Sequence, residues 1–184
     1  MKTVYYTAAS LDGFIADEEH SIEWLMQFPG GDESTVDFMS GVGAIAMGSS
    51  TYRWLLDYYA KHHPNDPTRW EYSQPVWVFS SRTLPGREGA DIRFVSGDVA
   101  PHHAAMVAAA DGKNVWLMGG GDLVGQFADK GLLDELVVTV APVTLGGGAP
   151  LLPRRIATPA LELVSVRQVG AHFAELIYRV AKGG

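Results

Sequence analysis

The chain contains no cysteine among its 184 residues. Disulfide bonds, thiolate metal sites and cysteine nucleophiles are therefore excluded, and the composition fits a reducing compartment. No apolar run approaches the ~20 residues of a membrane span, and the amino-terminal segment lacks the apolar core of a signal peptide. We therefore expect a cytoplasmic protein that does not act at a membrane.

Basic charge is scarce as well. The chain has 14 Lys and Arg residues against 21 Asp and Glu residues, which gives a formal net charge of -7. The Lys and Arg residues are scattered and form no basic stripe of the kind that binds nucleic acid. Adjacent histidines, at 62–63 and 102–103, point about 100° apart on a helix and do not form a metal-ligand pair. The sequence also lacks the G-x-S-x-G pattern of serine hydrolases. We therefore expect no nucleic-acid partner, no metal and no serine nucleophile.

Apolar residues, in contrast, make up 47% of the chain. This share is enough for the core of one globular domain over residues 1–184. Strand patterns alternate with helical patterns, which is typical of an α/β sheet with crossover helices. The expected strands are 2–9, 44–47, 75–80, 91–95, 114–118 and 135–142, and the expected helices are 32–42, 50–62, 100–112 and 122–131. Two further strand patterns, 161–169 and 172–181, are separated only by residues around Gly170 and predict an antiparallel hairpin. Its last strand is expected to present Glu175 and Arg179 on a solvent-exposed face.

Three consecutive glycines stand between a strand pattern and a helical pattern in "VWLMGGGDLVGQF", residues 115–127. Glycine lets a ligand approach the main chain closely, and a helix that begins there directs free N–H groups at an anion. Gly119, Gly120 and Gly121 therefore predict a phosphate site, although a simple turn from strand to helix would also explain them.

The segment "AIAMGSSTYRWLL", residues 44–56, repeats this arrangement. A strand pattern ends at Gly48, and the hydroxyl residues Ser49, Ser50 and Thr51 open a helical pattern, with Ser50 expected as the N-cap. Two such junctions in one small sheet predict two phosphate sites and hence a dinucleotide. Neither junction is the G-x-G-x-x-G fingerprint, which disfavours an ordinary Rossmann domain.

A third strand pattern ends in Ser80, Ser81 and Arg82. An acid at such a strand end would take ribose hydroxyls, whereas hydroxyl and guanidinium donors suit a 2′-phosphate. These residues therefore favour NADPH over NADH, unless Arg82 is only an exposed arginine in a polar turn.

These elements in this order, with "SLDGFIA", "LLDELVVTVAPVTLGGGAPLL" and a final hairpin ending in "YRV", resemble the dihydrofolate reductase-like superfamily. The nearest branch is the RibD C-terminal type, the reductase domain of riboflavin biosynthesis and its stand-alone relatives. The resemblance covers nearly the whole chain. It implies a three-layer α/β fold with a mixed, mainly parallel sheet of about eight strands, an NADPH-dependent reductase activity, and often a homodimer.

The resemblance also implies a cofactor site, residue by residue. The nicotinamide would be lined by Ala9, Ile15 and Ala16, one side of the phosphates would lie on Gly48, Ser49, Ser50 and Thr51, the 2′-phosphate would lie on Ser80, Ser81 and Arg82, and the pyrophosphate would lie along Met118, Gly119, Gly120, Gly121, Asp122 and Leu123.

The substrate side is less well defined. Asp12 precedes Gly13 in a strong turn pair, so a turn role competes with the role of a catalytic acid beside the nicotinamide. Asp32 is spaced like the buried acid of folate reductases, but it is also an obvious N-cap, and the sequence favours that role. Trp24 either stacks on a planar heterocycle or packs in the core.

The sequence therefore predicts an enzyme that transfers hydride from NADPH to a small heterocycle, either pterin-like or 5-amino-6-(5-phosphoribosylamino)uracil-like. A non-catalytic NADPH- or nucleotide-binding protein of the same fold is the alternative, and an open cavity beside the nicotinamide would favour the enzyme. A purely structural dimer module would leave both glycine junctions unexplained.

Overall fold

The computed structural model describes residues 1–29 and 33–181. Its strands are β1 (Thr3–Ser10), β2 (Phe14–Ala16), β3 (Val42–Gly48), β4 (Val76–Phe79), β5 (Ile92–Val95), β6 (Asn114–Gly119), β7 (Glu135–Ala141), β8 (Ala149–Pro150), β9 (Glu162–Val169) and β10 (Phe173–Arg179). Its helices are α1 (Glu23–Met26), α2 (Glu33–Ser40), α3 (Ser49–His62), α4 (Val99–Ala109) and α5 (Gly121–Asp129).

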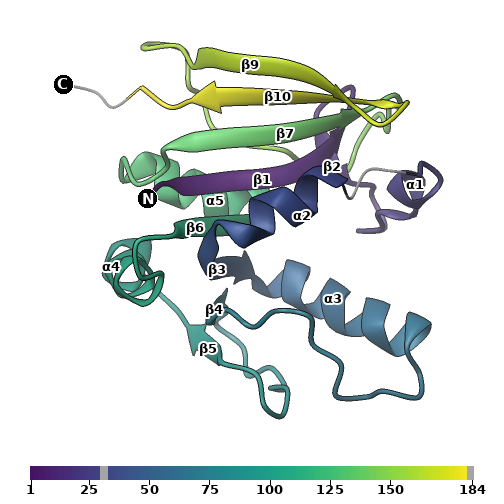
Figure 1. Ribbon diagram of the computed structural model, residues 1–184, viewed down its shortest axis with the longest axis vertical. Coiled ribbons are helices and arrows are strands. Elements are labelled where there is room, and N and C mark those ends of the chain that lie inside the picture. Colours follow the sequence, from purple (N-terminus) through teal and green to yellow (C-terminus); the bar gives the residue numbers. More distant parts are fainter. Residues whose placement is uncertain (30–32, 182–184) are drawn as a thin grey trace.

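One sheet of eight strands forms the middle of the molecule, in the order β5-β4-β3-β6-β1-β7-β10-β9 (Figure 1). The first six strands pair in parallel, and β10 pairs antiparallel with both β7 and β9. The hairpin turns at Gly170, whose φ of 56° is in the left-handed region that favours glycine. The predicted mixed sheet with an antiparallel carboxyl-terminal hairpin is therefore confirmed.

Helices cover both faces of this sheet. On one face, Val99 and Met106 of α4 and Phe127 of α5 pack in a buried cluster with Tyr5 and Leu117. On the other face, Tyr52, Leu55 and Tyr59 of α3 pack in a second cluster with Ile45 and Trp116. The helical spacing of apolar residues in 50–62 predicts this packing, because it places them on one side of the helix.

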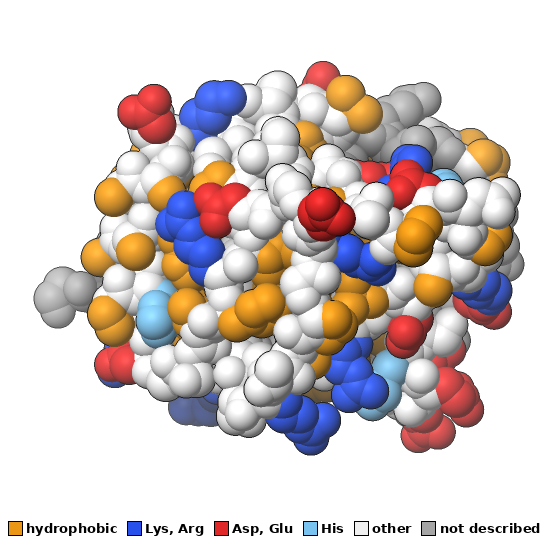
Figure 2. All heavy atoms as spheres, turned by 90° about the horizontal axis from the view of Figure 1, so that it is seen from below, with side chains coloured by type: hydrophobic (Ala, Val, Ile, Leu, Met, Phe, Trp, Pro, Cys, Tyr) orange, Lys and Arg blue, Asp and Glu red, His pale blue; other side chains and the backbone are white. Residues whose placement is uncertain are grey.

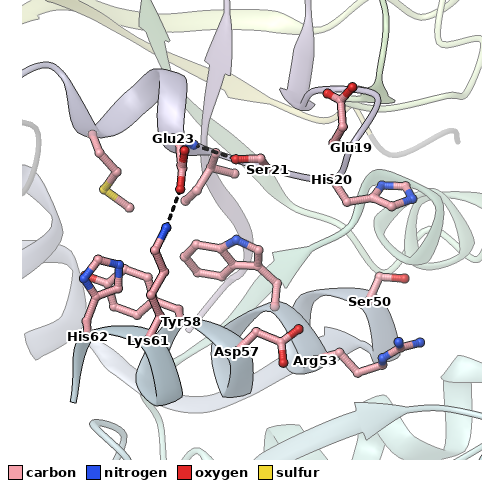
Figure 3. A pocket seen from close by; sticks show the side chains of 13 residues that line it. Glu19, His20, Ser21, Glu23, Ser50, Arg53, Asp57, Tyr58, Lys61 and His62 are labelled. Atoms are coloured by element: carbon pink, nitrogen blue, oxygen red, sulfur yellow. Dashed lines mark hydrogen bonds and ion pairs between the residues drawn. The ribbon is translucent and has the colours of Figure 1, made fainter. Parts of the chain in front are cut away.

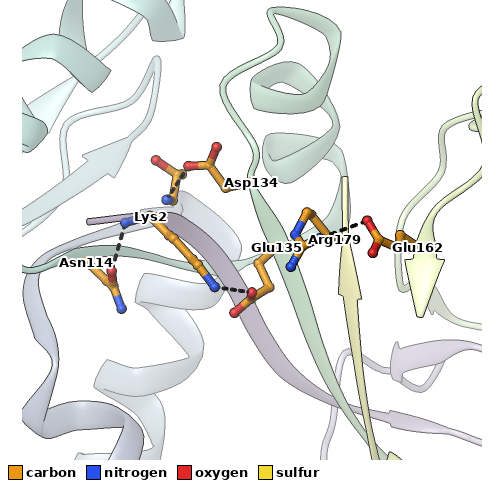
Figure 4. Close-up of polar contacts among 7 residues, drawn as sticks. Lys2, Asn114, Asp134, Glu135, Glu162 and Arg179 are labelled. Carbon is orange, nitrogen blue, oxygen red and sulfur yellow. Dashed lines mark hydrogen bonds and ion pairs between the residues drawn. The ribbon is translucent and has the colours of Figure 1, made fainter. Parts of the chain in front are cut away.

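Polar contacts fix the amino ends of the central strands (Figure 4). Lys2 donates from its backbone N to Asn114 Oδ1 at 2.8 Å and from Nζ to Glu135 Oε2 at 2.5 Å, which links β1 to β6 and β7. The backbone N of Thr3 donates to Asp134 Oδ2 at 2.8 Å. These contacts lie at the opposite ends of the strands from the glycine junctions and leave the carboxyl ends open to a ligand.

One expectation about the hairpin is wrong. Glu175 is 1% exposed, and its Oε1 accepts a 2.5 Å hydrogen bond from Nε of Arg167 on β9. The prediction of a solvent-exposed face holds only for Arg179, which pairs with Glu162 at the exposed end of the strand. Alternation along one strand does not reveal which neighbouring elements cover its face, and here the sheet and a counter-ion enclose Glu175.

The surface carries charges of both signs. On the face shown in Figure 2, Lys and Arg side chains lie scattered among acidic and apolar ones. Within residues 1–29 and 33–181, no helix has the length and apolar character needed to cross a membrane.

Candidate active site

The three predicted cofactor segments follow three neighbouring strands of the sheet. In the register of β3 with its neighbours, Gly48 lies opposite Phe79 of β4, and Met47 lies opposite Gly119 of β6. The carboxyl ends of parallel strands meet at one edge, which is where α/β sheets bind ligands. Residues 49–51, 80–82 and 120–123 therefore leave the sheet side by side.

Two helices begin at this edge with free amino termini. The N-cap of α3 is Gly48 and that of α5 is Gly120, and neither has a side chain to accept the first N–H groups of its helix. The prediction that Ser50 is the N-cap is wrong, because β3 continues in extended conformation through Gly48 and α3 already begins at Ser49. Both helix termini are left with donors that an anion can satisfy.

The glycines at these junctions differ in whether a backbone dihedral or a steric clash requires glycine there. Gly119 has a φ of 120°, which other residues rarely adopt, and a Cβ on Gly121 would overlap the carbonyl oxygens of Pro150 and Leu151. Gly48 and Gly120 have ordinary extended dihedrals, and a Cβ on either would meet its nearest neighbours at 3.8 Å. A positive φ at 119 and a steric clash at 121 therefore require glycine, whereas neither of these two reasons applies at 48 and 120.

The two glycines to which neither reason applies lie next to each other. The Cβ position of Gly48 is 3.8 Å from the O of Gly119 and from the N of Gly120. A ligand that touches both helix termini would occupy the space that these Cβ atoms would fill. This space between two uncapped helix termini is suited to an anionic group.

The β4 end supplies the third predicted segment. Ser80 Oγ accepts a hydrogen bond from the N of Arg82 at 2.9 Å, so a short turn presents Ser81 and Arg82 to solvent. Arg82 makes no ion pair with any residue in the described ranges. Its guanidinium is available to an anion.

We call the carboxyl edge of the sheet at Gly48 and residues 119–121 the glycine edge. A small two-stranded sheet closes its other side. β2 pairs antiparallel with β8 and brings Ile15 Cδ1 to 3.8 Å from the Cβ position of Gly120. Tyr5 donates from its hydroxyl to the O of Leu151 at 3.0 Å, which ties β8 to the main sheet. The predicted nicotinamide residue Ile15 therefore lies beside the predicted pyrophosphate loop, and Ala16 pairs with Ala149 in the same small sheet.

Asp12 fastens the loop between β7 and β8 to the end of β1. Its carboxylate accepts hydrogen bonds from Ser10 Oγ at 2.6 Å, from the N of Gly146 at 2.7 Å and from the N of Leu145 at 3.0 Å. The Ser10 hydroxyl and then the Gly146 N–H hold the pKa of the Asp12 carboxyl below its usual value. These hydrogen bonds support the turn and loop role of Asp12.

Asp12→Asn is expected to lower the melting temperature of the ligand-free protein at neutral pH, because the amide cannot accept all of these hydrogen bonds. The lowered pKa of Asp12 means that its contribution is complete above the ordinary value of 3.8 and is lost as the pH falls through the folded-state value. The difference in melting temperature between the two proteins, measured from pH 7 to pH 3, should therefore shrink in acid. A constant difference over this range would contradict the role, and Asp57→Asn, at an exposed acid of α3, is the control.

A pocket of about 550 Å³ opens beside the carboxyl half of β1. We call it the strand pocket; its lining includes Tyr6, Thr7, Ala8, Leu25, Met26, Phe28, Tyr58, Thr139 and Phe173. No charged side chain is among the described residues that line it. Thr139 is 5% exposed and its buried Oγ1 has no hydrogen-bond partner in the described structure, so the pocket offers one unsatisfied hydroxyl to a ligand.

Sequence reasoning missed Thr139. It lies on β7, directly opposite Ala8 of β1 and Glu175 of β10. A single hydroxyl residue inside the apolar run "ELVVTVA" was the available signal, since a buried polar group without a partner is uncommon.

A second pocket, of about 500 Å³, lies between α3 and the segment that leads into α1. We call it the helix pocket. It shares Met26 and Tyr58 with the strand pocket, and Ser50 lies at its other end. The two pockets are therefore neighbours, and the helix pocket reaches the first turn of α3 (Figure 3).

The remaining predicted residues are placed as follows. Ala9 and Leu123 are buried in the core, and Met118 packs against the α3 side of the sheet. Trp24 packs with Phe28 against Ala141, Val169 and Phe173, and its buried Nε1 has no partner in the described structure. Asp122 is exposed and pairs with Arg154 at 3.1 Å. Asp32 lies outside the described residues.

The fold and this edge of the sheet define a protein of the dihydrofolate reductase-like class. The chain matches the RibD C-terminal domain family over residues 2–174 and belongs to that family, which is one of NADPH-dependent reductases. The resemblance seen in the sequence is confirmed.

Two relatives from Bacillus subtilis (strain 168) match over nearly their full lengths. The uncharacterized protein YwjB is 34% identical over 176 residues, covering 92% of each chain. The uncharacterized protein YyaP is 27% identical over 175 residues, covering 93% of this chain and 90% of that protein. These matches establish the family and leave the reaction open.

Solved structures agree on the fold. A protein from Shewanella sp. PV-4 that is named for riboflavin biosynthesis is 28% identical, with a TM-score of 0.79 over 98% of this chain and 100% of that one. Dihydrofolate reductase from Enterococcus faecalis, complexed with NADP(H), is 14% identical, with a TM-score of 0.63 over 97% of this chain and 96% of that one. The diaminohydroxyphosphoribosylaminopyrimidine deaminase/5-amino-6-(5-phosphoribosylamino)uracil reductase from Thermotoga maritima is also 14% identical, with a TM-score of 0.67 over 98% of this chain and 56% of that one.

Proposed function

We propose that this protein is an NADPH-dependent reductase of a small planar heterocycle, bound in the strand pocket. The observation that carries the proposal is the pair Gly48 and Gly120, where neither a positive φ nor a steric clash requires glycine, set side by side at two uncapped helix termini. A bound dinucleotide explains both.

NADPH, when bound, would supply the hydride for an electron-poor carbon of a C=N or C=O bond, while the nitrogen or oxygen takes a proton. The protein's own part is to orient the two rings. The helix termini and Arg82 would hold the phosphates, Ile15 would lie against the nicotinamide, and Thr139 Oγ1 would hydrogen-bond a polar edge of the heterocycle. Asp12, ionised and tied to the 145–146 loop, keeps the β2 side of the site in place.

The substrate class follows from the lining of the strand pocket. Aromatic and apolar side chains with a few hydroxyls suit an uncharged planar ring that carries hydrogen-bonding groups. This supports a pterin-like or pyrimidine-like heterocycle. The open volume supports catalysis over the alternative, a binding protein of the same fold that only holds NADPH or another nucleotide.

NADPH is expected to raise the melting temperature more than NADH at equal concentration, because only NADPH has a 2′-phosphate for Arg82. Arg82→Ala should remove most of that difference, since a charge-assisted hydrogen bond contributes roughly 1.5 to 3 kcal/mol. Thermal shift with both cofactors makes the measurement, and Arg155→Ala, at another exposed arginine, should behave like the unaltered protein. Equal shifts from NADPH and NADH in the unaltered protein would refute the assignment.

We also propose a homodimer in the cytoplasm. β9 is an edge strand and exposes Leu163, Val164 and Val166, which supports association with a second copy. Light scattering should give twice the mass of the 184-residue chain at micromolar concentration. A monomer mass throughout the micromolar range would reject the dimer.

A further inference from the structure

The segment that follows β8 is fastened to α5 by one arginine. Nε of Arg154 donates to Asp129 Oδ2 at 2.9 Å, and Nη1 of Arg154 donates to Asp122 Oδ1 at 3.1 Å. The two acids are separated by about two turns of the helix. The Arg154 side chain is 26% exposed, whereas those of Asp122 and Asp129 are 73% and 54% exposed. A single, largely covered guanidinium therefore bridges the first and the last turn of α5.

Gly125 provides the space for this guanidinium. A Cβ at position 125 would lie 2.6 Å from Cζ and 2.7 Å from Nε of Arg154. Glycine in the middle of a helix is unfavourable relative to alanine, because it loses more conformational freedom on folding. The close approach of Arg154 thus gives a reason for a residue that weakens the helix.

The contact with Arg154 decides where the Asp122 carboxylate lies. Helical side chains lean toward the amino terminus, and a carboxylate in the first turn is attracted to the free N–H groups there. Asp122 instead accepts hydrogen bonds from Arg154 and, at 3.3 Å, from Nε2 of Gln126 one turn later. In the part of the chain that the structure describes, no side chain caps the start of α5. Asp122 is therefore held away from N–H groups that it could satisfy itself.

The same segment is fixed at its other end. Leu151 donates from its N to the O of Gly13 at 2.9 Å, and its O accepts the hydroxyl of Tyr5 at 3.0 Å. Its backbone also lies so close to α5 that a Cβ on Gly121 would overlap the Leu151 carbonyl oxygen. Arg154 consequently reaches α5 from a segment that is anchored beside the first residue of the helix.

We propose that Arg154 is a positioning residue for the anion site at the amino terminus of α5. It holds the Asp122 carboxylate back along the helix, so that the N–H groups of the first turn stay open to an anion. It also neutralises a charge that would repel this anion. Arg154 acts through Asp122 and not by contact with the ligand. The assignment rests on the proposed function, in which the anion is the pyrophosphate of NADPH.

Inorganic pyrophosphate tests this role without a nucleotide and without turnover. In calorimetry on the full, NADPH-free chain, Arg154→Met should bind pyrophosphate about fivefold more weakly than the unaltered chain, the size of one charge interaction at a helix terminus. Adding Asp122→Ala to Arg154→Met should restore the affinity, because the competing carboxylate is gone. Adding Asp129→Ala instead should not restore it, since Asp129 lies at the far end of α5. A merely structural role of Arg154 predicts no difference between the two double variants.

Melting curves without ligand establish which variants are folded. If Arg154→Met does not fold, Gly125→Ala takes its place in the same comparisons, because its Cβ displaces the guanidinium while alanine favours the helix.

Three results would overturn the proposal. They are unchanged pyrophosphate affinity on loss or displacement of the guanidinium, equal effects of the two added substitutions, and no binding of pyrophosphate by the unaltered chain at millimolar concentration. A failure of the reductase function would appear as absent NADPH binding while the pyrophosphate pattern persists, so the two failures are distinguishable.

Discussion

Gly48→Ala is expected to weaken NADPH binding at least tenfold, about 1.4 kcal/mol, while the melting temperature of the ligand-free protein stays unchanged. The dihedrals of Gly48 suit any residue, and a Cβ there meets the protein only at 3.8 Å. A methyl group would instead occupy the space between the two helix termini, where the phosphates are expected. Calorimetry with NADPH and a melting curve without ligand provide the two readouts.

Gly121→Ala is the matched control for this prediction. A Cβ at Gly121 overlaps backbone carbonyl oxygens of Pro150 and Leu151, so this change should lower the melting temperature of the ligand-free protein. Gly120→Ala should behave like Gly48→Ala, because its Cβ would only touch Ile15. If Gly48→Ala and Gly120→Ala both bind NADPH with unchanged affinity, the glycine edge serves only to turn the chain.

Arg167→Met is expected to destabilise the folded protein by about 2 kcal/mol or more, because it leaves the buried Glu175 carboxylate without its partner. We expect less destabilisation than for an ion pair that is buried on both sides, because the Arg167 side chain is 54% exposed. Urea unfolding at pH 7 measures it. Adding Glu175→Gln to Arg167→Met should restore much of the loss, since a neutral amide is less costly to bury.

The neighbouring pair of Arg179 and Glu162 supplies the control on the same hairpin. Both side chains are exposed, at 54% and 62%, so Arg179→Met should cost well under ~1 kcal/mol. Equal losses from Arg167→Met and Arg179→Met would mean that the burial of Glu175 has no energetic consequence.

The sequence predicts the strands, α3 and the hairpin well because the residues that mark each element lie within or next to it. Apolar runs bounded by glycine and proline mark the strands, helical spacing marks α3, and Gly170 marks the hairpin. It does not predict that Glu175 is buried, since this depends on the strands and the arginine that surround it. The strand order is likewise a property of the assembled sheet.

The candidate site was predictable where its residues are next to one another in the chain. The glycine junctions and residues 80–82 follow strand ends, and parallel pairing brings these ends together. Thr139, Tyr58 and Arg53 were missed because segments that are distant from one another in the chain build the two pockets. The support for a loop role of Asp12 comes only from the structure, which places the N–H groups of Leu145 and Gly146 against it.

The central claim is that two helix termini, at Ser49 and Gly121, hold one dinucleotide between them. Amide hydrogen exchange read by mass spectrometry, with and without saturating NADPH, tests this claim most directly because it reports on the backbone N–H groups themselves. The account predicts slower exchange on NADPH binding in peptides that contain residues 49–51 and in those that contain 121–123, together with the 80–82 turn. Unchanged exchange at both helix termini under saturating NADPH, or protection confined to another part of the chain, would contradict it.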